Sequence, residues 1–167
     1  MQKFYQKACP QYLNPSFCRR GITVIEILVV VSILGILVLV VLPQFSKIKE
    51  NQVLKNAVED TVSVLHNAES QSLASINSSE YGVHFQSDRV ILFKGKVFSS
   101  GAGDNKTINI ISPANISNVT LGGVSATTGD VYFARLSGVP NKTGTITVST
   151  ASFSKIITLS ATGTVSF

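Results

Sequence analysis

The sequence "ITVIEILVVVSILGILVLVVL", residues 22–42, is an apolar run with a single charged side chain, Glu26. As an α-helix, a run of this length is about 30 Å long, which matches the hydrocarbon core of a bilayer. The run therefore predicts a transmembrane helix. A carboxylate in such a helix costs up to about 3 kcal/mol on insertion scales and needs a partner. Anchoring alone does not explain Glu26.

The segment before this run, residues 1–21, is basic and contains no acid. It holds Lys3, Lys7, Arg19 and Arg20, as well as both cysteines, Cys9 and Cys18. The whole chain has a net charge of +5, whereas residues 22–167 have a net charge of only +1. The basic balance is thus weak evidence for nucleic-acid binding. By the positive-inside rule the N-terminus is expected in the cytoplasm and the rest of the chain outside it.

A second helical pattern follows the apolar run. Pro43 lacks an N–H and disfavours helix at Leu42, which predicts a kink or local break there. Beyond it, apolar and small residues recur every three or four positions, so one face of an amphipathic helix is expected. These positions are Leu54, Val58, Thr61 or Val62, Leu65, Ala68, Ser72 and Ile76. The helix is expected to run from about residue 22 to 76 and to end at residues 77–79.

From residue 80 the period changes to two, which is typical of strands. Eight strands are expected, the first two as a hairpin around residues 86–88, with turn-forming residues between the others. Their expected ranges are 81–85, 89–94, 107–111, 116–121, 131–135, 145–149, 154–160 and 164–167. The predicted fold class is α+β, with a long N-terminal helix packed on an antiparallel β-sandwich or β-roll.

The stretch "RRGITVIEILVVVSILGILVLVVLP", residues 19–43, resembles the cleavage motif and first helix of type IV pilins and type II secretion pseudopilins. The resemblance implies that a prepilin peptidase cuts between Gly21 and Ile22 and that the new amino group of Ile22 is N-methylated. The family usually has Phe or Met at that position, so Ile22 is a departure. The implied division is a cleaved cytoplasmic leader (1–21), a transmembrane and assembly helix (22–42), its amphipathic continuation (43–79) and an extracytoplasmic β-domain (80–167).

Glu26 has two interpretations in this setting. The resemblance implies that its carboxylate pairs with the Ile22 amine of a neighbouring subunit and so sets the axial register of a filament. A buried pair of this kind leaves an uncompensated charge when the register is wrong. Alternatively, Glu26 complements the positive N-terminus of its own helix. In related filaments the segment between a glycine and a proline loses helicity on assembly, which Gly35 and Pro43 would permit here. Gly35 could equally be a close-packing site.

The β-domain resembles the GspH/FimT-type pseudopilins in its first hairpin, "SSEYGVHFQSDRVILFKG" at residues 78–95, and in its closing strands. This implies a minor subunit, often at or near a filament tip. Some FimT-like minor pilins bind DNA. The basic residues Arg89, Lys94, Lys96 and Lys106, with two phenylalanines interleaved, could supply such a surface. The more common meaning of such alternation is a solvated strand face.

No catalytic, metal or cofactor site is expected. His66 and His84 have no recognisable partner in the sequence, and Asp104 and Asp130 are isolated. The expected protein is therefore not an enzyme. It is a pilin-like subunit in the bacterial inner membrane whose expected partners are other pilins or pseudopilins and prepilin peptidase. A secreted cargo and DNA are further candidate partners. The competing hypothesis is a signal-anchored binding domain that does not assemble.

Overall fold

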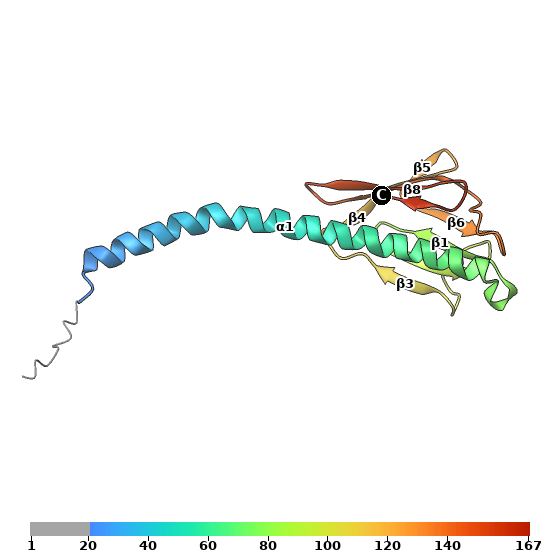
Figure 1. Cartoon of the computed structure of the whole chain (residues 1–167), viewed down its shortest axis with the longest axis horizontal. Helices are drawn as coiled ribbons and strands as arrows, with labels where there is room; N and C mark the ends of the chain where they lie inside the picture. Colours follow the sequence, from blue (N-terminus) through green and yellow to red (C-terminus); the bar gives the residue numbers. More distant parts are fainter. Residues whose placement is uncertain (1–20) are drawn as a thin grey trace, which may run out of the picture. The chain divides into compact units, whose positions relative to one another are not determined.

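The computed structural model describes residues 21–167, which form one long helix and two antiparallel sheets (Figure 1). The chain divides into two units, Met1–Val40 and Val41–Phe167. Helix α1, Val24–Leu73, begins in the first unit and ends in the second. A single 3-10 turn, η1 at Ile76–Ser78, follows it.

Helix α1 agrees closely with the helix expected from the sequence. It begins two residues later and ends three residues earlier than predicted, because Ser75, Asn77 and Ser78 adopt positive φ angles that a right-handed helix excludes. Backbone helix continues through Gly35 and Pro43, so the local break considered at Leu42 is not present. The kink at Pro43 stays a prediction.

The second unit buries one face of α1. All the predicted stripe positions from Leu54 to Ser72 are buried, and at the alternative position Thr61 is buried whereas Val62 is only half-buried. The Thr61 hydroxyl donates a hydrogen bond of 2.7 Å to the Ala57 carbonyl, which satisfies it inside the core. Ile76 was wrongly included in the stripe. It lies in η1, beyond the end of α1, and is exposed.

The strands form a four-stranded sheet of order β3-β2-β1-β6 and a five-stranded sheet of order β5-β4-β7-β8-β9. All the pairings are antiparallel. The strands are β1 (Tyr81–Phe85), β2 (Arg89–Lys94), β3 (Lys106–Asn109), β4 (Asn115–Leu121), β5 (Val124–Ala126), β6 (Gly129–Phe133), β7 (Gly144–Ser149), β8 (Ser154–Leu159) and β9 (Val165–Ser166).

All eight predicted strands are present, and the β1–β2 hairpin is confirmed in the predicted ranges. The sequence missed β5, which lies in a segment read as a turn because it is short and rich in Gly, Ser and Thr. Its side chains are exposed, so burial left no periodic signal in this strand. It is held by backbone pairing with the end of β4.

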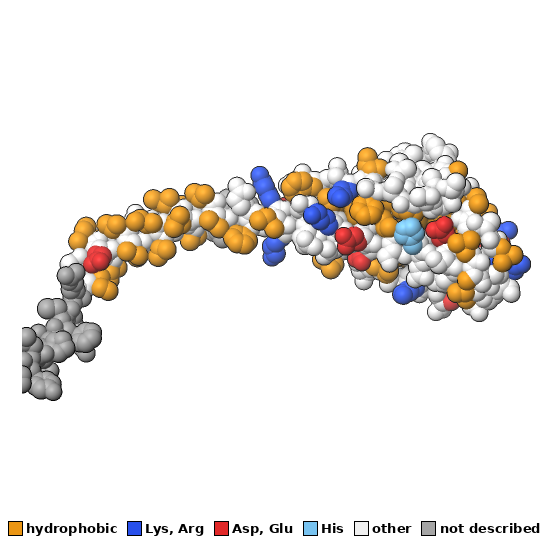
Figure 2. Space-filling view, viewed as in Figure 1, with side chains coloured by type: hydrophobic (Ala, Val, Ile, Leu, Met, Phe, Trp, Pro, Cys, Tyr) orange, Lys and Arg blue, Asp and Glu red, His pale blue; other side chains and the backbone are white. Residues whose placement is uncertain are grey.

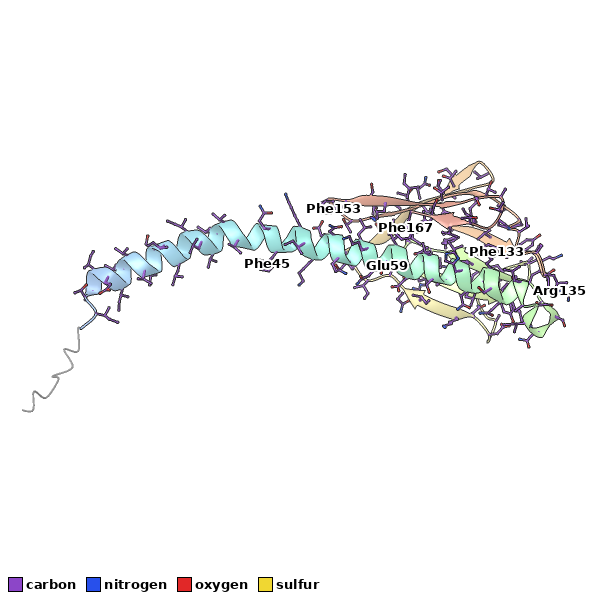
Figure 3. The ribbon with its side chains drawn as sticks, viewed as in Figure 1. Phe45, Glu59, Phe133, Arg135, Phe153 and Phe167 are labelled. Atoms are coloured by element: carbon purple, nitrogen blue, oxygen red, sulfur yellow. The ribbon has the colours of Figure 1, made fainter. Side chains whose placement is uncertain are left out.

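One hydrophobic core joins α1 to both sheets. It combines the buried face of α1 with inward-facing residues of six strands, among them Phe85 and Phe133, which are fully buried (Figure 3). The α+β class is therefore confirmed, with one long helix and two antiparallel sheets. No cysteine lies in residues 21–167, so this core forms without disulfides.

The outer face of the four-stranded sheet has a second, smaller apolar cluster around Phe93. This side chain is almost fully buried although it is not part of the main core. Gly82, paired with it on β1, leaves room for the ring, since a Cβ there would lie 2.4 Å from Phe93 Cζ and 2.7 Å from the Val131 carbonyl oxygen. A close approach of this kind requires glycine.

Candidate functional site

The first part of α1 has an apolar surface that nothing in the described structure covers. Every described side chain from residue 21 to 41 is exposed, and the large apolar ones are 44–78% exposed. Figure 2 shows this surface as a nearly continuous band of hydrophobic side chains with one acidic group near its start. By length and composition α1 is apolar enough to cross a membrane, a test that signal sequences also pass.

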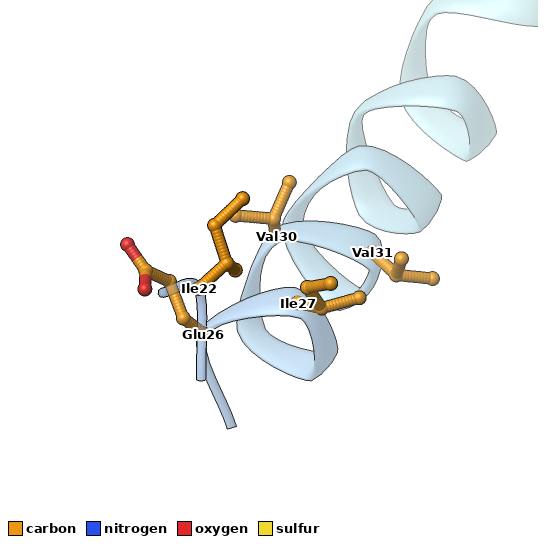
Figure 4. A pocket seen from close by; sticks show the side chains of 5 residues that line it. All are labelled: Ile22, Glu26, Ile27, Val30 and Val31. Atoms are coloured by element: carbon orange, nitrogen blue, oxygen red, sulfur yellow. The ribbon is translucent and has the colours of Figure 1, made fainter. Parts of the chain in front are cut away.

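Glu26 lies in the first turn of α1, beside a shallow groove of about 210 Å³. The groove is otherwise apolar, and its other lining residues are Ile22, Ile27, Val30 and Val31. Figure 4 shows Ile22 folded back toward Val30, while the Glu26 carboxylate points away from the helix. In an apolar environment such a carboxylate needs a cation from another molecule or from the chain's own N-terminus.

Thr23 caps the N-terminus of α1 through a contact that the sequence analysis did not identify. The hydroxyl oxygen of Thr23 accepts a hydrogen bond of 3.3 Å from the Glu26 N–H, three residues on. This is half of a capping box, whose sequence signal is Thr or Ser followed by Glu or Gln at the third position after it. The helix begins at Val24 for this reason. This bond uses the backbone N–H of Glu26 and not its carboxylate, so it does not decide between the two interpretations of that side chain.

The residues of the predicted cleavage site lie at the start of the described chain. Gly21 and Ile22 are exposed and precede α1, so the peptide bond between them is not inside a helix. A Cβ built on Gly21 would meet no atom within 4 Å. The predicted roles of the basic side chains and cysteines of residues 1–20 fall outside the described residues.

Gly35 has no close neighbour in the described structure. A Cβ built there would meet nothing within 4 Å, and the residue is exposed. Packing within residues 21–167 therefore does not require glycine at this position. A close-packing role would need a second molecule.

The four basic residues considered for DNA are not equally available. Arg89 makes hydrogen bonds of 2.6–3.2 Å to the Asp88 carboxylate, and Lys96 lies 3.7 Å from Glu80. The hydrogen bond from Arg89 lowers the pKa of the Asp88 carboxyl below its ordinary value, and Asp88 in turn raises the pKa of Arg89.

The two remaining lysines, Lys94 and Lys106, are exposed, and within residues 21–167 neither makes an ion pair.

Both phenylalanines of this region are engaged with protein. Phe93 is almost fully buried, and Phe98 stacks on the ring of His84 with centroids 3.9 Å apart and planes 5° apart. The edge of Phe98 also meets Phe93 at 5.7 Å between centroids. Phe93 therefore offers no free face of the kind that stacks on nucleic-acid bases, and one face of Phe98 is covered by His84.

His84 does have a partner, which corrects the sequence analysis. Asp130 lies directly opposite it in the β1–β6 pairing, and Nδ1 of His84 is hydrogen-bonded to the Asp130 carboxylate. Nε2 of His84 meets Gln86 Nε2 at 3.1 Å. His84 and Asp130 are 46 positions apart in the sequence, so only the sheet brings them together. His66 likewise lies 3.5 Å from Glu69, one helical turn away.

The His84 arrangement resembles the base half of a catalytic pair, but both ring nitrogens are occupied and Phe98 lies over the ring. It holds the loop that carries Phe98 against the outer face of the sheet. Among residues 21–167 no group of three or more His, Cys, Asp or Glu side chains is placed to hold a metal ion.

Comparison of the chain with models of protein families, with curated proteins and with solved structures finds no match.

Proposed function

We propose that this chain is a structural subunit of a pilus-like fibre, of the GspH/FimT-type minor pseudopilin class, in a type II secretion pseudopilus or a type IV pilus. The observation that carries the proposal is the exposed apolar surface of residues 22–41, whose only charged side chain is Glu26. A surface of this size is stable only in lipid or against other apolar helices. The inner membrane provides the lipid before assembly, and the helices of neighbouring subunits provide the apolar contacts in the fibre.

In this proposal a prepilin peptidase cuts the chain between Gly21 and Ile22 on the cytoplasmic side. The exposed, non-helical position of both residues is compatible with entry into a peptidase cleft. Cutting there produces an amine on Ile22, which lines the same groove as Glu26. A long helix whose second half packs on a β-domain is also the form expected of a subunit of this class.

A signal-anchored domain that does not assemble is the main competing function. It explains the apolar surface as a membrane anchor, and it explains Glu26 as an acid that complements the N-terminus of its own helix. The two functions differ in the fate of residues 1–21. Intact-mass measurement of chain extracted from membranes with an active prepilin peptidase should find a species that begins at Ile22. A chain that keeps residues 1–21 under those conditions would exclude the fibre subunit.

The role of Glu26 is tested by two substitutions that separate its charge from the rest of its side chain. Glu26→Gln keeps the size of the side chain and removes the carboxylate charge, and Glu26→Ala removes both. Neither change removes the Thr23 hydrogen bond, because its donor is the backbone N–H of residue 26. If Glu26 pairs with an amine of a neighbouring subunit, both variants are cut normally but enter fibres poorly. If it only complements the N-terminus of its own helix, both variants enter fibres as well as the unchanged chain does.

DNA uptake is not favoured by any contact in residues 21–167. Two of the four basic side chains face acids, and both neighbouring aromatic rings are packed on protein. A gel shift with residues 45–167 at low salt is expected to be weak. Tight binding that disappears with salt would restore DNA as a partner.

A further inference from the structure

The part of α1 at residues 44–52, called here the lysine segment, presents two cations to solvent. Lys47 and Lys49 are exposed, and within residues 21–167 neither makes an ion pair. Two positions correspond to about 200° of rotation around an α-helix, so they project to opposite sides. Figure 2 shows basic side chains on both sides of α1, just before the helix meets the strands.

The acid of this segment is turned away from solvent. Glu50 is half-buried, and its Oε2 is buried without a hydrogen-bond partner among the described residues. The next acid along α1 is Glu59, about 13 Å further on at 1.5 Å per residue. The exposed charge of the lysine segment is therefore positive.

Apolar side chains accompany the two lysines. Phe45 and Ile48 are 60% and 64% exposed, and their spacing of three places them on one side of the helix. Figure 3 shows Phe45 on the part of α1 that the strands do not cover. An exposed aromatic ring and an aliphatic side chain between two ammonium groups suit the boundary of a bilayer, where acyl chains meet phosphates.

We propose that the lysine segment binds the headgroups of anionic phospholipids at the extracytoplasmic face of the membrane. The segment begins two residues after the apolar run of residues 22–42, so a membrane around that run would reach it. Each lysine contributes a preference of about fivefold for anionic over neutral lipid at low salt. The proposal rests on the part of the proposed function that puts residues 22–42 in a membrane, and it is independent of fibre assembly.

The sequence allows a direct measurement, because the chain contains no tryptophan. Phe45→Trp places a single fluorophore in the lysine segment of the full chain. The chain is reconstituted in phosphatidylcholine vesicles with about one fifth phosphatidylglycerol, a bilayer whose anionic lipid attracts basic segments. Bromines, which quench tryptophan, are carried either by the phosphatidylglycerol or by an equal amount of the phosphatidylcholine. The overall lipid composition is thus identical in the two samples.

Brominated phosphatidylglycerol is expected to quench more strongly than brominated phosphatidylcholine. The excess should disappear in Lys47→Gln/Lys49→Gln, and it should shrink in about 0.5 M salt, where the Debye length is about 4 Å. The matched control, Lys94→Gln/Lys142→Gln, removes the same charge from exposed positions of the β-domain and should keep the excess. Inorganic phosphate at equal ionic strength should not remove it either.

Equal quenching by the two brominated lipids, or an excess that survives loss of both lysines, would overturn the proposal. An excess that vanishes when the protein is diluted at constant lipid would also overturn it, because the partner would then be a second copy of the chain. Flotation with the vesicles separates the two proposals. If the chain floats but shows no excess quenching by brominated phosphatidylglycerol, only the proposed lipid binding by the lysine segment is contradicted. If the chain does not float, the membrane anchor is contradicted as well.

Discussion

His84 and Asp130 face each other across β1 and β6, and Nδ1 of His84 is hydrogen-bonded to the Asp130 carboxylate. Phe98 stacks on a face of the same imidazole ring. The strands fix the histidine, and the histidine in turn provides the platform on which Phe98 and its loop rest. This relationship predicts that the loop depends on the ring of His84.

Replacing His84 by alanine removes the surface under Phe98. Stacked aromatic pairs contribute about 0.5–1.5 kcal/mol beyond the area they bury, so the free energy of unfolding should fall by at least about 1 kcal/mol. Amide hydrogen exchange in residues 96–105 should increase more than exchange in the core strands. Lys94→Ala, at an exposed position at the end of β2, is the control and should leave exchange in this loop unchanged. A loop unaffected by His84→Ala would show that other contacts hold it.

Ser72 joins the end of α1 to the four-stranded sheet. Its hydroxyl oxygen accepts a hydrogen bond of 2.9 Å from the Tyr81 N–H, and its carbonyl oxygen accepts one of 2.9 Å from the Leu136 N–H. Ser72→Ala leaves the buried Tyr81 N–H without this acceptor, which should cost about 1–3 kcal/mol in denaturant unfolding. Ser70→Ala, on the exposed face of α1, should change stability by less than about 0.5 kcal/mol. Equal effects of the two changes would contradict the role of Ser72.

The Asp88–Arg89 pair predicts a small pH dependence of stability. The hydrogen bond from Arg89 lowers the pKa of Asp88 in the folded state below its ordinary value of 3.8. A lowered folded-state pKa contributes stability that is present above the unfolded-state pKa and is lost as the pH falls through the folded-state pKa. The stability difference between the unchanged chain and Asp88→Asn should therefore be constant near neutral pH and shrink below about pH 4. Urea unfolding of the two chains followed against pH measures this difference, and a difference that does not change with pH would contradict the role of the pair.

A substitution at Gly35 tests helix stability in the single chain and helix packing in the fibre as two separate properties. Alanine is the better helix former by about 1 kcal/mol, and a Cβ at Gly35 meets nothing within 4 Å in the described structure. Gly35→Ala should therefore leave the membrane-extracted single chain at least as helical by circular dichroism. If neighbouring helices pack on Gly35, or if the helix must open there, the same variant should enter fibres less efficiently. Normal incorporation would contradict both roles.

The sequence by itself determined the features that depend on local pattern. The apolar run and the three-to-four periodicity each involve residues close in the chain, so the extent of α1 and its buried stripe followed from them within three residues. The change to a period of two similarly predicted the β1–β2 hairpin and the other strands with buried faces.

Only the tertiary structure decided which distant residues meet. The pairing of β1 with β6 set Asp130 opposite His84, and the loop after β2 laid Phe98 over that ring, which removed two aromatic faces from solvent. The exposed strand β5 and the inward turn of Glu50 were likewise invisible in the sequence. The physical reason is that strand order and side-chain burial arise from packing between distant segments, whereas periodicity reports only which side of its own element a residue occupies.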